Sequence, residues 1–342
     1  MPATPIGAAL DLTKATRALP FAPFLAPPAI GNPAYNGAAP FPWGNPPLST
    51  LNNAMAGYAF TPPPFAPGAG DPSVCGLLNE LTFFPNGAAI QLLGSPFLIK
   101  SGVLEIQPTK ATAAQAAAAA LTSYLAGRPL YSGAMCTFPY GQLGGVFEFE
   151  FQAPNPMQPG RWLAGWLLPN NGQQTTELDV FEMVMSQAGV LSVTSSVHSS
   201  NAAYMAEYWS GPDEGTTTIP VAFDPSAAAH RYTVWVQPDY TAIFIDRACV
   251  LCYVTPPDFI DTTWYLIIDD TAAAATGWDG PLALGDTALP PSLWLDVGAY
   301  TGTIAAGSAA PPASTVTPAS VQAQLAQAVA IVQAASANVG KL

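Results

Sequence analysis

The chain has 342 residues, of which 50% are hydrophobic and 11% aromatic, and its formal net charge is −13. This apolar content and length allow a full-sized core and exclude a disordered chain. With only 9 Lys and Arg against 22 Asp and Glu, nucleic acid and anionic membrane surfaces are poor partners, and a neutral ligand fits better. No apolar run has the length of a transmembrane helix, so no membrane span is expected.

Residues 1–74 are rich in Pro, Ala and Gly and carry scattered aromatic side chains. This composition predicts an extended arm with apolar anchors, which either is a flexible leader or lies against its own globular domain, a sister subunit or a larger assembly. The first residues make a poor signal peptide, because the apolar stretch is interrupted by Pro20, Pro23, Pro27 and Pro28. Export by the common route is therefore not expected.

Residues 75–306 read as many short strands separated by turn residues. The stretch "GVFEFEFQAP" alternates cleanly, with Phe147, Phe149 and Phe151 on one face and Glu148 and Glu150 predicted to face solvent on the other. The absence of a strand–helix–strand rhythm predicts an all-β domain made of two packed antiparallel sheets.

Two features interrupt this pattern. The alanine-rich stretch 111–127 predicts a single helix ending at Gly127. The spacing Cys249-x-x-Cys252 suggests metal or redox chemistry, but positions i and i+3 of a strand point to opposite faces. We therefore expect ordinary apolar packing for these two cysteines.

Residues 307–342 form the last segment, which begins with the linker-like "GSAAPPAST". A short helix is predicted after Pro318, because apolar residues follow a heptad spacing at Val321, Leu325, Ala328, Val332, Ala335 and Val339. Two readings stay open: the helix lies back on the sandwich, or it associates with sister chains or another protein through residues 318–342.

The stretch "TTELDVFEMV" places three carboxylates in six residues of a strand that otherwise reads as buried: Glu177, Asp179 and Glu182. Strict alternation puts Glu182 on the opposite face from Glu177, and one bulge residue after Asp179 brings all three onto one face. Mutual repulsion then separates their pKa values, which equips the group for glycoside hydrolysis by an acid and a nucleophile. From spacing alone, a solvated acidic strand or a calcium site remains an alternative.

The hexapeptide "ELDVFE" resembles the E-x-D-x-x-E signature of glycoside hydrolase family 16, the laminarinase and agarase type of endo-glycanase. Several stretches around it resemble that family's strands in the same order, among them "GGVFEFEFQAP", "RWLAGWLLP", "VHSS", "HRYTVWVQPDYTAIFIDR" and "PPSLWLDVGAY". The resemblance covers residues 75–302 and implies a concanavalin A-like β-jelly-roll sandwich with a cleft across its concave face. Residues 75–306 are then the catalytic domain.

The resemblance also implies roles for individual residues. Glu177 matches the nucleophile, Glu182 the general acid/base, and Asp179 the acid between them that tunes their protonation. Trp162 and Trp166 match two cleft tryptophans, and Trp162 is expected to offer a platform to a sugar ring. His198 matches a cleft histidine that hydrogen-bonds sugar. No cofactor or catalytic metal is implied, although a structural calcium ion is compatible with the family.

Two departures from the family pattern bear on substrate specificity. Gly165 stands where a bulky residue is usual between the two tryptophans, which suggests a wider cleft at that point. Asp269 stands where Asn or a similar polar residue is common.

The favoured function is an endo-acting retaining glycosidase that acts on a β-linked polysaccharide, such as a β-glucan, a galactan or a bacterial exopolysaccharide. A transglycosylase with the same three acids and a non-catalytic carbohydrate-binding or structural sandwich are the alternatives. Because a polysaccharide hydrolase works outside the cell and no signal peptide is recognisable, a phage depolymerase attached to a virion is one way to reconcile the two. In that case residues 1–74 and 318–342 would serve attachment or homo-oligomerisation.

Overall fold

The computed structural model of this protein describes residues 6–17, 74–75, 82–85, 96–100, 103–120, 126–136, 141–169, 176–186, 188–209, 214–219, 221–272 and 289–307. The predicted C-terminal helix and its linker, apart from Gly307, lie outside these residues, as does most of the predicted N-terminal arm. Within the described part of the chain, no helix is both long and apolar enough to cross a membrane.

Ten strands form the larger of two antiparallel sheets, in the order β21-β1-β18-β17-β16-β11-β20-β6-β5, with β2 also paired to β20. Their bounds are β1 Ala9–Asp11, β2 Ala15–Arg17, β5 Phe97–Lys100, β6 Val103–Ile106, β11 Gly145–Gln152, β16 His230–Val236, β17 Tyr240–Ile245, β18 Ala248–Val254, β20 Ser292–Gly302 and β21 Ala305–Gly307.

Seven strands form the second antiparallel sheet, in the order β10-β19-β12-β13-β14-β15, with β9 paired to β19. They are β9 Ala134–Cys136, β10 Gln142–Leu143, β12 Arg161–Pro169, β13 Glu177–Met185, β14 Leu191–His198, β15 Glu214–Thr218 and β19 Thr263–Ala272.

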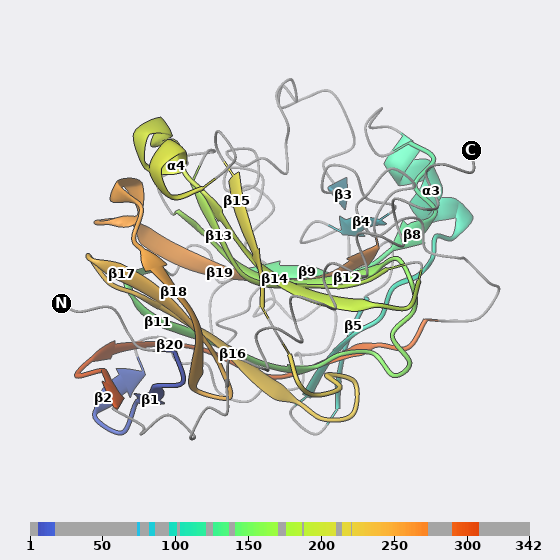
Figure 1. The fold of residues 1–342 in the computed structure, drawn as a ribbon. Helices are drawn as coiled ribbons and strands as arrows, with labels where there is room; N and C mark the ends of the chain where they lie inside the picture. The colour runs from blue at the N-terminus through green and yellow to red at the C-terminus, as the bar shows by residue number, and fades with distance from the viewer. Residues whose placement is uncertain are drawn as a thin grey trace, which may run out of the picture.

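A small third sheet, in the order β3-β4-β8-β7, contains a parallel pair between β4 and β8. Its strands are β3 Val74–Cys75, β4 Thr82–Pro85, β7 Thr109–Lys110 and β8 Leu130–Tyr131, and the described helices are α3 Ala113–Ala120, α4 Ala202–Tyr208 and the 3₁₀ turn η3 Pro257–Phe259. The small sheet with α3 and, at the other end, α4 stand over the outer face of the seven-stranded sheet (Figure 1). They rise on either side of the strands that carry the predicted catalytic acids.

The two large sheets stack face to face (Figure 1) and enclose one main apolar core. The predicted alternation of β11 is confirmed on this side, because Phe147, Phe149 and Phe151 are all buried in the core. The prediction for the other face was wrong for Glu148. This side chain is buried. Its carboxylate accepts a hydrogen bond from Thr233 Oγ1 and lies against Arg247.

Residues 6–17 join the ten-stranded sheet through β1 and β2. They cover its outer face (Figure 1), where Leu10 and Leu12 pack with Phe244 in a second apolar cluster. This part of the predicted arm therefore lies against its own sandwich. The domain boundaries at 74 and 306 themselves stay predictions.

Cys249 and Cys252 belong to this second cluster, Cys249 buried in it and Cys252 packed against it. Apolar packing is thus confirmed, but the expected opposite orientation of the two side chains was wrong. The register between β17 and β18 shifts between Ile243 and Phe244, and the extra residue on β18 turns both cysteines to the same face. The predicted helix 111–127 is α3, which ends at Ala120 in the described part.

Candidate active site

The three predicted catalytic acids lie together on the outer face of the seven-stranded sheet. The register between β13 and its two neighbours shifts between Asp179 and Glu182, as the one-face arrangement requires. Val180 and Phe181, the two residues inside the shift, both point into the core. The predicted bulge is therefore confirmed.

Strand pairing arranges the open face in rows, because directly paired residues of antiparallel strands share a face. Glu177 pairs with His198, which pairs with Glu214. The next row runs from Trp166 through Asp179 and Ser196 to Thr216. The third row contains Asp269, Ala164, Glu182, Thr194 and Thr218.

Glu177 and Asp179 both lie beside His198. Glu177 is paired with it across the two strands, and His198 Nε2 lies 3.2 Å from Asp179 Oδ2. Burial is the main reason that the pKa of Glu177 is raised well above its usual range, followed by the charge of Asp179 and a hydrogen bond with it. Burial lowers the pKa of His198, but the bond to Asp179 and the nearby carboxylates raise it more, to about 10. His198 is therefore positively charged at neutral pH and offsets part of the acidic charge.

Glu182 is nine-tenths buried and accepts a hydrogen bond from Ser196 Oγ at 2.8 Å. Burial and the charge of Asp179 raise its pKa, while the Ser196 hydroxyl lowers it, and the net value is about 8. Glu182 thus carries a proton at neutral pH. A protonated carboxylic acid beside an ionisable carboxylate is the pair that general acid catalysis of glycoside cleavage requires.

Both predicted tryptophans lie on β12 with their side chains on this face, but their exposure differs. Trp166 is 5% exposed and donates from Nε1 to Asp269 Oδ2 at 2.8 Å, whereas Trp162 is partly exposed. Trp162 is therefore the one with a ring surface that a sugar can reach. Asp269 is buried, and its pKa is raised to about 8, chiefly by burial.

The expectation that Gly165 widens the cleft was wrong. A Cβ at this position would meet the rings of Phe181 and Phe149, the nearest atom at 2.4 Å. Those rings belong to the core. The pairing of β12 with β19 runs unbroken from Arg161 to Pro169, and alternation along β12 puts Gly165 on the opposite face from Ala164 and Trp166. The glycine therefore faces inward and makes room for the aromatic rings beneath the site.

A comparison with known proteins adds sequence evidence. No family model matches the chain. Among curated proteins, endo-1,3-1,4-beta-glycanase ExsH of Rhizobium meliloti (strain 1021) is 29% identical over 174 residues, which cover 51% of this chain and 33% of that protein. Endo-1,3-1,4-beta-glycanase EglC of the same strain is 28% identical over 212 residues, which cover 62% of this chain and 38% of that protein. The matched segments span 33% and 38% of the length of these two relatives.

Solved structures give the fold. SCLam, a non-specific endo-beta-1,3(4)-glucanase from family GH16, superposes with a TM-score of 0.54 at 16% identity, covering 88% of this chain and 95% of that one. This chain resembles the endo-glycanases of glycoside hydrolase family 16. The laminarinase catalytic domain from Thermotoga maritima MSB8 has a TM-score of 0.50 at 18% identity, and the superposition covers 66% of this chain and 84% of that one. The predicted jelly-roll sandwich is thereby confirmed for the two large sheets.

The sandwich fold brings all six predicted site residues to the same open face of the seven-stranded sheet. Sequence reasoning missed the polar residues that support them, above all Ser196, Thr216 and Glu214. A signal for part of this set was present, because Thr194, Ser196 and His198 alternate along "LSVTSSVHS" and alternate residues of a strand share a face.

One group among the described residues has the composition of a metal site. Glu177, Asp179 and His198 each offer one ligand atom, and these atoms lie within 4.8 Å of one another. The same atoms belong to the predicted catalytic centre, and charge compensation by His198 accounts for the cluster. We assign no ion to it.

Proposed function

We propose that this chain is an endo-acting retaining β-glycanase that cleaves a β-1,3-1,4- or β-1,3-linked glucan. The observation that carries the proposal is the bulge of β13, which turns Glu177, Asp179 and Glu182 to one face beside His198. The curated relatives are named for 1,3-1,4-β-glycanase activity. A variant of SCLam, co-crystallised with 1,3-beta-D-cellotriosyl-glucose, presents 1,3-beta-D-cellobiosyl-glucose at its active site.

The first step assigns attack to Glu177 and proton donation to Glu182. Glu182 gives its proton to the glycosidic oxygen while the Glu177 carboxylate bonds to the anomeric carbon, and the leaving sugar departs with that proton. For Glu177 to attack, its carboxyl group has to be ionised. Positively charged His198 lowers the pKa of Glu177 and so favours its ionised form.

In the second step, the Glu182 carboxylate takes a proton from water, and the resulting hydroxide breaks the bond between Glu177 and the sugar. The anomeric configuration is therefore retained. Trp162 supports a sugar ring on its exposed face, and His198 is available to a sugar hydroxyl. Because the substrate is a polymer, we place the site of action outside the cell. The relatives do not support a virion role, which stays a prediction.

The test is a panel of glucans and galactans followed by reducing-end release, with proton NMR of the first anomer formed. We expect cleavage of mixed-linkage β-glucan or laminarin with retention. First formation of the inverted anomer would overturn the role of Glu177 as nucleophile. Lengthening of added oligosaccharides would identify a transglycosylase, and binding without cleavage would identify a carbohydrate-binding sandwich.

A further inference from the structure

A line of side-chain oxygens crosses three neighbouring strands on the open face, from Glu182 on β13 to Glu214 on β15. Ser196 Oγ donates to Glu182 Oε2 at 2.8 Å and lies 3.1 Å from Thr216 Oγ1. Thr216 Oγ1 donates to Glu214 Oε1 at 2.9 Å. Ser196 is 1% exposed, whereas Thr216 and Glu214 are exposed. The line therefore leads from a buried carboxyl group to solvent.

The number of hydrogens in this line depends on the two carboxyl groups at its ends. Three oxygen–oxygen contacts need three hydrogens, but Ser196 and Thr216 supply only one each. When both glutamates are ionised, each hydroxyl donates to its own carboxylate, and the contact between Ser196 and Thr216 has no hydrogen. One added proton, on either Glu182 or Glu214, completes all three bonds.

We propose that Ser196, Thr216 and Glu214 form a one-proton relay that connects Glu182 to solvent. The proposal rests on the proposed function, because it takes Glu182 as the general acid/base. In this scheme the three residues are positioning residues, since none of them has to touch the substrate. The relay holds its proton at the Glu182 end or at the Glu214 end, and the hydroxyl hydrogens reverse direction between the two states.

The two states correspond to the two halves of the proposed reaction. In the first, protonated Glu182 donates to Ser196, Ser196 to Thr216, and Thr216 to the Glu214 carboxylate. After Glu182 gives its proton to the leaving oxygen, solvent protonates Glu214, and all the hydrogen bonds then point toward the Glu182 carboxylate. When Glu182 takes a proton from water in the second step, Glu214 returns its proton to solvent. Protons balance over the cycle.

Several charged groups interact with Glu182: Glu214 at the far end of the relay, and Glu177, Asp179 and His198 outside it. Asp179 lies on the same strand, and its charge raises the pKa of Glu182, as does that of Glu214 on β15. His198 on β14 lowers it. On the other side, the paired residue of β12 is Ala164, and the next titratable group in that row is Asp269 on β19. The experiment must therefore separate transmission through the hydroxyls from an effect of charge through space.

The test is the pH dependence of kcat/KM on mixed-linkage β-glucan for single and double variants. Glu214→Gln removes a charge that raises the pKa of Glu182, so the alkaline limb should move to lower pH. Ser196→Ala removes a bond that lowers this pKa, so the limb should move to higher pH, with a loss in rate of about tenfold. A general structural defect would not move the alkaline limb in opposite directions for these two substitutions.

The deciding variant is Thr216→Val, which interrupts the line and leaves the bond between Ser196 and Glu182 in place. If the hydroxyls transmit most of the effect, Glu214→Gln should cause a much smaller shift once Thr216 is replaced, because only the through-space charge of Glu214 then acts on Glu182. An equal shift in both backgrounds would overturn the relay and leave only a through-space charge. Thr218→Val, on the same face of β15 and outside the line, is the matched control and should leave the profile unchanged.

The outcome for the relay is separable from the outcome for the proposed function. Activity that survives Glu182→Gln would sink the catalytic assignment itself. Loss of activity in Glu182→Gln together with a Glu214→Gln profile identical to that of the native protein would refute the relay alone. Melting temperatures of all variants show whether each one is folded.

Discussion

Glu182 is the residue whose surroundings set the pH range of the proposed reaction. Its pKa of about 8, raised by burial and by Asp179, keeps the acid form present below that pH and removes it above. We therefore expect kcat/KM on β-glucan to fall as the pH rises through about 8. A profile that stays flat to pH 10 would contradict the assignment of Glu182 as general acid.

Substitution of the two catalytic glutamates should remove activity without unfolding the protein. Burial raises the pKa of both Glu177 and Glu182 above the ordinary value of a glutamate. The folded protein therefore binds more protons than the unfolded chain from mildly acidic pH upward, and its stability decreases as the pH rises. Glu177→Gln and Glu182→Gln relieve this cost. We expect turnover to fall by at least about a hundredfold and the melting temperature at neutral pH to stay level or rise. Asp179→Asn should keep partial activity with a shifted pH optimum.

Asp269 allows a separate test of how a buried carboxyl group beside the site affects stability. Its pKa is raised to about 8, so its contribution to stability is most unfavourable above that pH and is absent below the unfolded pKa. Asp269→Asn keeps an acceptor for the indole N–H of Trp166. We expect the melting temperature of the variant to exceed that of the native protein by a margin that grows from pH 4 to pH 8. A constant margin would show that Asp269 does not titrate in this range.

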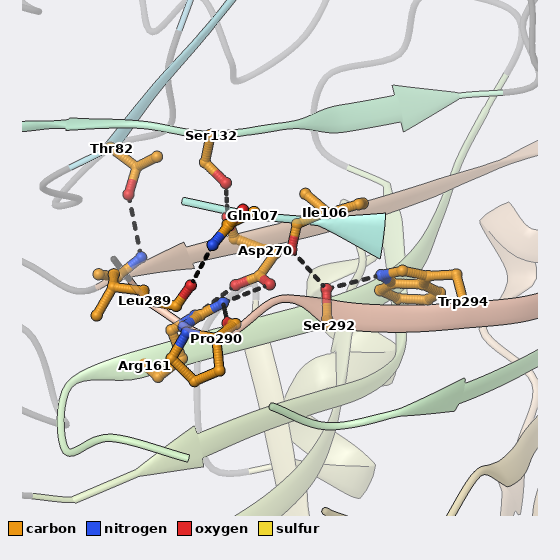
Figure 2. Close-up of polar contacts among 11 residues, drawn as sticks. Thr82, Ile106, Gln107, Ser132, Arg161, Asp270, Leu289, Pro290, Ser292 and Trp294 are labelled. Atoms are coloured by element: carbon orange, nitrogen blue, oxygen red, sulfur yellow. Dashed lines mark hydrogen bonds and ion pairs between the residues drawn. The ribbon is translucent and has the colours of Figure 1, made fainter. Parts of the chain in front are cut away.

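At the scale of strands, a buried ion pair ties the two sheets together at one end of the sandwich. Arg161 on β12 donates to both carboxylate oxygens of Asp270 on β19, at 2.6 and 2.7 Å. The same guanidinium donates to the carbonyl of Pro290, just before β20 of the other sheet, at 3.0 Å. Figure 2 shows this pair among further polar contacts, including Ser292 Oγ to Ile106 O and Trp294 Nε1 to Ser292 Oγ. Both charged side chains are fully buried.

Removal of one partner should therefore leave an uncompensated buried charge. We expect Arg161→Met to lower the free energy of unfolding by about 3–5 kcal/mol, measured by urea denaturation. Arg231→Met, which breaks the more exposed pair with Glu150, should cost about 1 kcal/mol or less. Similar losses for the two variants would mean that the buried pair contributes no more than a surface one.

At the scale of the whole molecule, residues 6–17 close the outer face of the ten-stranded sheet. Leu10 is buried with Phe244, and Arg17 donates to Asp296 Oδ1 at 2.6 Å. We expect deletion of residues 1–17 to lower the free energy of unfolding by more than Leu10→Ala, which should cost about 2 kcal/mol. Calorimetry of the two variants is the measurement. A deletion without effect on the melting temperature would show that the sandwich is complete without this segment.

The opposite expectation holds for residues 318–342, which lie outside the described residues. Their heptad spacing predicts a helix of about 20 residues, which is marginal in water unless its apolar face is covered. We expect the truncated protein to keep its fold and its activity on short oligosaccharides, and to change its state of assembly. Light scattering at matched concentration tests this. If the full-length and the truncated protein are both monomers, and truncation lowers the melting temperature by many degrees, the helix packs on its own sandwich.

The sequence by itself determined the class of fold and the acid trio. Both follow from local patterns: alternation along a strand puts Phe147, Phe149 and Phe151 into the core, and the spacing of Glu177, Asp179 and Glu182 requires a bulge whatever the rest of the chain does. The motif order around the trio then sufficed to recognise the family resemblance. The alternation and the acid spacing each lie within a few residues of the feature that they predict.

Only the tertiary structure decided which residues support the site. The rings of Phe149 and Phe181 that fill the space beside Gly165 come from two other strands, and the line from Glu182 to Glu214 depends on the pairing of three strands. The bond of Trp166 to Asp269 and the pairing of Arg17 with Asp296 join residues 103 and 279 positions apart. Contacts at such separations are set by strand order and register across the whole sandwich, and side-chain periodicity along one strand carries no information about them.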